Sequence, residues 1–304
     1  MTRRTTGALF LLMGLAFGGT FPAISVGLAD APPLVLAAVR YDLAALLMLA
    51  FVALRHDRWV PSTSGDRRAV VAAGVFSVGG SGLLFLGQQF TTSGVAAVLF
   101  GLIPIMTAGL AWVLLPTERL GRRGVVGLLV GFLGVAVVVS PTPASLLAPD
   151  VVGKGLVLGA AISISVSSIL VRRADATLHP SAVTAWALAL GAGVIHLGSL
   201  ALGESLGAVT PTPRLGVALL WLALVASLGF AAYYALLARV GATRTSLVSY
   251  VVPLVATAVG TLVLEEPLAA TTVVGFLVVL VGFALIGWDD LRAGLRRPGT
   301  VRAD

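Results

Sequence analysis

Long apolar stretches separated by short polar gaps run along the whole chain. Ten of them have a length close to the ~20 residues that a helix needs to cross a bilayer. They cover residues 7–28, 34–54, 69–90, 93–115, 121–140, 155–171, 181–202, 215–238, 245–264 and 270–288. Prolines punctuate the gaps, as helix breakers do. The pattern predicts an all-α integral membrane protein with ten transmembrane helices.

Positive charge falls in every second gap. With the N-terminus in the cytoplasm, 17 of the 20 Lys and Arg residues lie in cytoplasmic segments. The outer gaps then hold only Lys154 and Arg214, and Arg40 lies inside a span. Because Lys and Arg are retained on the cytoplasmic side during insertion, both termini are expected there. We expect a multi-pass protein of the plasma membrane.

Composition supports a lipid environment and argues against other classes. The chain is 58% hydrophobic and only 11% charged, too apolar to cover a soluble surface. Its net charge of +7 lies in short loops and in the tail, so we expect no nucleic-acid partner. There is no Cys and no phosphate-binding loop, and intramembrane enzyme motifs are absent. No cofactor, metal site or enzymatic activity is expected.

An internal repeat divides the chain. Glu118, Gly127 and Gly134 recur at the same spacing as Glu266, Gly275 and Gly282, shifted by 148 residues. Five spans per half is an odd number, so the second half must insert upside down. The expected parts are a first repeat at 7–140, a linker at 141–152, a second repeat at 153–288 and a cytoplasmic tail at 289–304. Two inverted five-helix repeats are typical of secondary transporters, with a channel as the weaker alternative.

Several motifs resemble those of EamA-type permeases in the drug/metabolite transporter superfamily. They are Ala37-Ala38-Val39-Arg40-Tyr41, Gln89-Phe90-Thr91-Thr92-Ser93 leading to Pro104, the run from Arg239 to Ser246 leading to Pro253, and Leu264-Glu265-Glu266-Pro267-Leu268. The resemblance implies export of a small organic metabolite, amino-acid-like or amphipathic, by alternating access. A uniporter or exchanger of other solutes, such as drugs or nucleotide-linked metabolites, and an intramembrane enzyme are the alternatives.

Arg40 is the leading candidate for a substrate-binding residue. It lies six residues into its span, about 9 Å deep at 1.5 Å per residue. A guanidinium at that depth can bind a carboxylate. The alternatives are a side chain that reaches back to the interface or pairs structurally.

The ninth span carries a polar stripe on one helical face. Its members are Ser246, Ser249, Tyr250, Pro253, Thr257 and Thr261. The stripe predicts a cavity wall, with bonds between helices as the alternative. Pro253 and the matching Pro104 are candidate helix breaks or hinges, and Thr107 is the nearby polar group in the first repeat.

Other polar and aromatic residues within spans are weaker candidates for substrate contacts. They are Tyr41, Ser81, Gln88, Ser163, Ser167, Trp186, His196, Tyr233 and Tyr234. Helix packing is the competing explanation for each, although His196 could also relay protons. The Gly127-x3-Gly131 pair could serve a homodimer contact instead of packing within the chain.

Overall fold

The computed structural model describes residues 3–115, 121–140, 145–227, 229 and 248–286. These residues form helices and turns without a strand. Seven helical segments in this part are long and apolar enough to cross a membrane, and three shorter apolar helices accompany them. The fold expected from the apolar pattern is therefore confirmed as an all-helical membrane protein.

The helices follow one another with short connections. In chain order they are α1 (Arg3–Gly18), α2 (Thr20–Leu28), α3 (Pro33–Arg55), α4 (Ser64–Val71), the π-helix η1 (Ala72–Val78), the 3-10 turn η2 (Gly79–Ser81), α5 (Gly82–Gln88), α6 (Ser93–Phe100), α7 (Ile103–Leu114), α8 (Arg122–Val139), α9 (Pro149–Arg173), α10 (Pro180–Ala201), the 3-10 turn η3 (Leu206–Ala208), α12 (Val248–Val263) and α13 (Ala270–Ile286). A further helix spans Pro213–Ser227.

Three of the expected spans are irregular. The first is interrupted at Gly19, between α1 and α2, and the third passes through η1 and η2. The fourth breaks between α6 and α7, where Pro104 occupies the first turn of α7. Pro is tolerated at that position because its missing N–H would have no partner in the helix. Pro253, in contrast, lies inside the continuous helix α12.

The boundaries of the sixth span differ most from expectation. The sequence pattern predicts 155–171, but α9 runs for 25 residues from Pro149 and therefore begins inside the expected linker 141–152. Lys154 forms an ion pair with Asp150 one turn earlier, at 2.7 Å. This pairing reduces the cost of carrying both charges in the helix, so the helix extends past the apolar run.

Glycines allow α8 and α13 to pack with their backbones almost in contact. A Cβ on Gly127 would lie 2.5 Å from the carbonyl oxygen of Gly282, and one on Gly134 would lie 2.9 Å from that of Gly275. The Gly127-x3-Gly131 face is thus occupied within the chain, since Gly131 packs on Ile105. The glycine pair therefore serves packing within the chain, the alternative named for it, and a homodimer stays a prediction.

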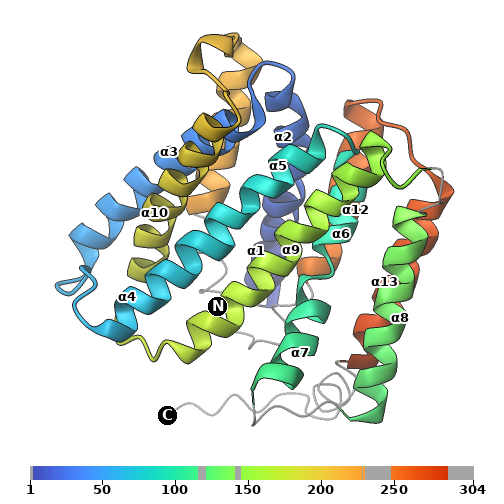
Figure 1. The fold of residues 1–304 in the computed structure, drawn as a ribbon, viewed down its shortest axis with the longest axis horizontal. Coiled ribbons are helices and arrows are strands. Elements are labelled where there is room, and N and C mark those ends of the chain that lie inside the picture. Colours follow the sequence, from blue (N-terminus) through green and yellow to red (C-terminus); the bar gives the residue numbers. More distant parts are fainter. Residues whose placement is uncertain (1–2, 116–120, 141–144, 228, 230–247, 287–304) are drawn as a thin grey trace.

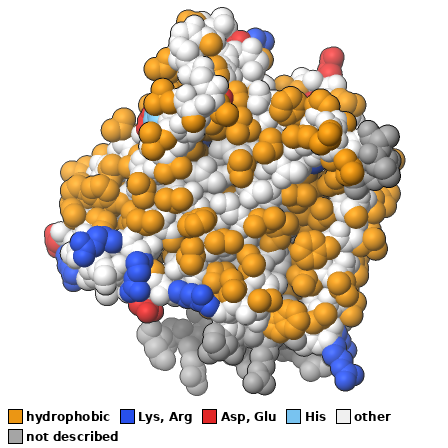
Figure 2. Space-filling model, viewed as in Figure 1, with side chains coloured by type: hydrophobic (Ala, Val, Ile, Leu, Met, Phe, Trp, Pro, Cys, Tyr) orange, Lys and Arg blue, Asp and Glu red, His pale blue; other side chains and the backbone are white. Residues whose placement is uncertain are grey.

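Helices distant in sequence lie side by side. Figure 1 shows α8 and α13 paired at one edge and α3 and α10 at the opposite edge. Between them α5 packs on α9, and α12 packs on α1 and α6. Figure 2 shows apolar side chains over most of one face, with Lys and Arg mostly along its lower edge. We call the end where α2 ends and α3 begins the outer end, following the charge pattern, and the opposite end the inner end.

Candidate functional site

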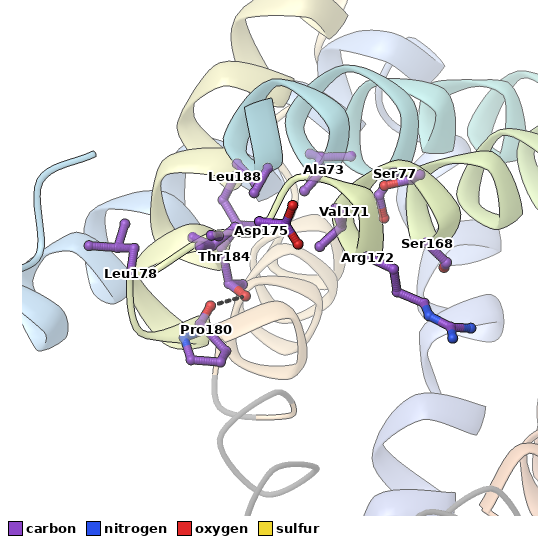
Figure 3. Close-up of a pocket in the computed structure, with 16 residues that line it drawn as sticks. Ala73, Ser77, Ser168, Val171, Arg172, Asp175, Leu178, Pro180, Thr184 and Leu188 are labelled. Atoms are coloured by element: carbon purple, nitrogen blue, oxygen red, sulfur yellow. Dashed lines mark hydrogen bonds between the residues drawn. The ribbon is translucent and has the colours of Figure 1, made fainter. Parts of the chain in front are cut away.

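A cavity of about 480 Å³ opens near the inner end, between α4, η1, α9 and α10. Apolar residues line most of it, including Ala73 and Leu188. Hydroxyl groups come from Ser77, Ser168 and Thr184, and Figure 3 shows them reaching the cavity from three different elements. Mostly apolar walls with a few polar groups are typical of sites for small organic molecules.

Charged residues of both signs belong to the cavity lining. Asp175 and Arg172 follow one another closely at the inner end of α9, and both contribute to the lining. Both side chains are exposed, and Figure 3 shows the Arg172 guanidinium extending away from the other labelled lining residues.

Arg40 is buried in the described structure without a carboxylate partner. Its side chain is 7% exposed, and Nε has no hydrogen-bond partner among the described residues. The guanidinium carbon lies 4.6 Å from the ring centre of Tyr41 and 5.5 Å from that of Phe85. Cation–π contacts compensate part of the cost of burying the charge. The guanidinium keeps donors available for an anion.

Tyr41 connects this region with the cavity wall. Its hydroxyl lies 2.8 Å from Ser81 Oγ, and Ser81 Oγ donates to the carbonyl of Val78 at 2.6 Å. Val78 lines the cavity. Tyr41 is therefore linked through Ser81 to the cavity wall, and Arg40 lies against Tyr41 and Phe85 on the side towards the outer end.

Four polar residues form a hydrogen-bonded network at the outer end, and we call it the outer seal: Ser25, Gln88, Ser93 and Glu266. The Glu266 carboxylate accepts hydrogen bonds from Ser93 N and Ser93 Oγ, both at 2.9 Å, and from Ser25 Oγ at 3.1 Å. Gln88 Nε2 donates to Ser25 Oγ at 3.0 Å and to the carbonyl of Phe21 at 2.6 Å. The seal joins α2, α5 and α6 to the turn between α12 and α13.

Two further carboxylates link segments of the two halves at the outer end. Glu204 accepts from the first backbone amides of α3, at Leu34 and Val35. Asp30 receives two hydrogen bonds of 2.6 Å from the Arg214 guanidinium. Hydrogen bonds from Arg214, with one from Thr212, lower the pKa of Asp30 to about 2. The outer end is thus held together by charged and polar contacts between segments that are distant in the sequence.

The inner end carries links of a different kind. Asp66 accepts from the backbone amides of Thr177 and Leu178, at 2.8 and 2.9 Å, which joins the start of α4 to the turn after α9. Trp186 Nε1 donates to the carbonyl of Trp59, and the two indoles stack with centroids 5.9 Å apart. Trp186 therefore packs structurally in this conformation instead of lining the cavity described above.

Two of the serines expected to bind substrate are engaged between helices. Ser163 Oγ donates to the carbonyl of Phe76 at 2.7 Å, and Ser167 Oγ donates to that of Ala72 at 3.1 Å. Both carbonyls belong to η1, whose π-helical geometry disturbs the regular backbone bonds. Ser163 therefore acts here as a packing contact, whereas Ser167 also belongs to the cavity lining.

His196 is paired with an acidic residue from another helix. Its Nε2 lies 2.8 Å from Oδ2 of Asp42, which joins α10 to α3. The sequence pattern did not predict that Asp42 would pair with His196. The signal that could have found the pair is that both residues lie in the corresponding spans of the two halves.

The remaining candidates do not gather at one place. Thr107 lies half-buried on α7, and Thr257 lies against Gly94 where α12 crosses α6. Ser249 and Tyr250 belong to α12, but their side chains, like Tyr233 and Tyr234, lie outside the described residues. Among the described residues, no group of three His, Asp or Glu side chains could hold a metal ion.

Sequence reasoning missed most of the outer seal. Glu266 and Ser93 were named only as members of the repeat and of motifs, and Ser25 was not named. Ser93 does begin α6 and donates its backbone amide to Glu266, which is a capping contact supplied from a distant segment. The sequence does contain a signal for this network: Ser25 and Ser93 lie near ends of spans that are expected on the same side of the membrane as the turn with Glu266.

Comparisons with known proteins identify the family. The EamA-like transporter family matches residues 5–140 and again residues 152–288. A solved crystal structure aligns over 96% of this chain and 99% of its own, with a TM-score of 0.65 and 19% identity, which indicates a shared fold.

Curated relatives cover nearly the whole chain. The uncharacterized inner membrane transporter YedA of Escherichia coli (strain K12) is 30% identical over 90% of this chain and 89% of its own. A probable amino-acid metabolite efflux pump of Salmonella typhimurium is 30% identical over 92% of this chain and 93% of its own. An uncharacterized transporter of Archaeoglobus fulgidus is 27% identical over 91% and 97%. With its apolar helices and its cavity, the chain belongs to the EamA-like transporter family.

Proposed function

We propose that this transporter moves a small anionic or zwitterionic organic metabolite, of amino-acid type, across the plasma membrane by alternating access. The observation that carries the proposal is the position of Arg40. It is a buried cation without a carboxylate partner among the described residues, and its neighbour Tyr41 is linked through Ser81 to Val78 of the cavity wall. A carrier needs its binding group between two ends that close in turn.

The proposed architecture is ten spans in two inverted repeats, with both termini in the cytoplasm. The helix contacts support it, because they come in equivalent pairs under the repeat. Contact of α1 with α12 corresponds to contact of α9 with α7. The pairs α3–α10 and α8–α13 correspond to themselves. Such symmetry allows the halves to exchange conformations.

The substrate class rests on two further observations. The cavity lining contains the carboxylate of Asp175, which suits a solute with an ammonium group. One relative is named a probable amino-acid metabolite efflux pump. Facilitated diffusion or exchange of other solutes is the second candidate, and the family makes an intramembrane enzyme the weakest.

Counterflow in proteoliposomes tests the proposal, with a pool of labelled amino acids as the probe. Loss of a charge-assisted hydrogen bond costs roughly 1.5–3 kcal/mol, so Arg40→Ala should raise KM by about 10- to 100-fold. Arg40→Lys keeps the charge and should retain part of the affinity. Arg58→Ala, at an exposed loop position, is the control. Equal KM values for the native chain and Arg40→Ala would contradict the assignment of Arg40, and no counterflow by the native chain would contradict the solute class.

A further inference from the structure

Asp42 and His196 form an acid–histidine pair well inside the membrane-spanning region. Asp42 lies nine residues after the start of α3 at Pro33, about 13 Å along the helix at 1.5 Å per residue. His196 lies five residues before the end of α10 at Ala201. Their side chains keep 47% and 44% of their surface exposed, and Asp42 Oδ2 and His196 Nε2 are 2.8 Å apart. Ionisable residues at such depth are costly and usually functional.

Few other charged groups face this pair. On α3, Arg40 points to a different face, two residues from Asp42, and Arg55 lies at the inner end. Apart from Tyr41, next to Asp42 on α3, the remaining titratable groups on the described elements packed against α3 and α10 lie at the two ends of the bundle. They are Asp30, Glu204 and Arg214 at the outer end, and His56, Asp66, Arg67, Arg68 and His179 at the inner end.

We propose that the Asp42–His196 pair is the proton-binding site that couples transport to the proton gradient. Without the proton, the pair is a carboxylate beside a neutral imidazole and carries one negative charge. One proton from water binds the imidazole, which then donates Nε2–H to Oδ2 of Asp42 and leaves the pair without net charge. Release returns the same proton to water, so the cycle needs no other reactant.

The unprotonated and the protonated pair differ in the free-energy cost of being buried away from water. A lone carboxylate is costly in a low-dielectric environment, whereas a proton-loaded pair is closer to neutral. A conformation that excludes water from the pair therefore favours the loaded form, and one that admits water favours release. Among the described residues, no protein atom lies within 4 Å of a Cβ built on Gly193, one turn before His196, so this part of the chain does not cover this side of α10.

Proton binding is coupled to solute movement because the two residues lie on helices from different halves of the chain. Asp42 comes from the first half of the chain and His196 from the second, on helices α3 and α10 that pack along each other. This step rests on the proposed alternating access, because exchange between the halves would change the α3–α10 contact. A change in that contact alters the proton affinity of the pair, and linkage then makes solute movement depend on the proton.

Proteoliposomes loaded with labelled amino acids separate coupling from transport itself. An imposed pH gradient should drive net movement in the native chain at least tenfold above the rate without it. Asp42→Asn and the double variant Asp42→Asn with His196→Gln keep hydrogen-bonding side chains, so both should fold. We expect both to lose the response to the gradient while retaining counterflow, which moves no net proton. Asp150→Asn, at a carboxylate whose side chain is 55% exposed, is the control and should respond like the native chain.

The possible outcomes are distinct. Counterflow by native chain and variants, with a gradient response confined to the native chain and the Asp150→Asn control, supports the coupling role. A full gradient response in Asp42→Asn, or none in the native chain despite active counterflow, overturns it. Absence of counterflow in the native chain overturns the proposed function, and the coupling role falls with it.

Discussion

Replacing Glu266 with Gln tests whether the outer seal holds the chain closed at its outer end. The Ser93 backbone amide donates to Glu266 Oε2 at 2.9 Å, while the two serine hydroxyls lie near Oε1. A Gln can keep one accepting oxygen for the hydroxyls, but its NH2 group then faces the Ser93 N–H. The charge-assisted hydrogen bond from the Ser93 amide is therefore lost, and two donors, the Gln NH2 group and the Ser93 N–H, face each other.

The size of the effect follows from that lost bond. Bonds to charged groups contribute roughly 1.5–3 kcal/mol, and the partial exposure of Glu266 places its loss near the lower limit. A destabilisation of about 1.4 kcal/mol changes the ratio of closed to open outer ends about tenfold. The matched control is Glu265→Gln, because Glu265 is the exposed neighbour of Glu266 in the same turn.

The chain offers a clean assay because it contains no Cys. Thr257→Cys places a thiol where α12 meets Gly94 of α6, one turn below the point where Glu266 touches Gly260. In intact cells, a membrane-impermeant maleimide should label this Cys about ten times faster when Glu266→Gln is added. Labelling at the same rate with Glu266→Gln and with Glu265→Gln would refute the role of the seal.

Two further predictions concern stability. Gly127→Ala should lower the unfolding free energy by about 1–3 kcal/mol, because the new Cβ meets the carbonyl of Gly282. Gly155→Ala, where a Cβ meets nothing within 4 Å, should be neutral or stabilising in the same denaturation assay. The pKa of Asp30 is lowered to about 2 in the folded chain, so ionised Asp30 should stabilise the folded chain above pH ~4. This stabilisation should be lost as the pH falls towards 2. Thermal unfolding in detergent at pH 5 and pH 3 should show a smaller acid-induced loss in Arg214→Gln than in the native chain, and equal losses would contradict the link.

The apolar pattern predicted the helices well but could not place every boundary. The start of α9 was missed because Asp150 and Lys154 interrupt the apolar run, and only their mutual ion pair explains why the helix includes them. Pro149 in the first turn is a helix-start signal that the apolar pattern does not weigh. Interruptions at Gly19 and before Pro104 also depend on packing that hydropathy does not report.

The candidate site was harder to predict because side-chain roles depend on helix rotation and neighbours. Burial of Arg40 next to Phe85 could not be read from one helix, since Phe85 is supplied by α5. Ser163 and Ser167 looked available, but they bond to carbonyls of a π-helix that has no sequence signature. Asp42 and His196 meet only when α3 and α10 pack with one particular rotation.

The glycine contact between α8 and α13 has a consequence for the origin of the chain. Gly127 meets Gly282, and Gly134 meets Gly275, so each helix presents the same two small residues to the other. A contact of this kind is self-complementary about a two-fold axis. An ancestral five-helix chain with glycines at these two positions could therefore have paired with an oppositely inserted copy of itself. Gene fusion would then have made permanent an assembly that two separate chains already formed.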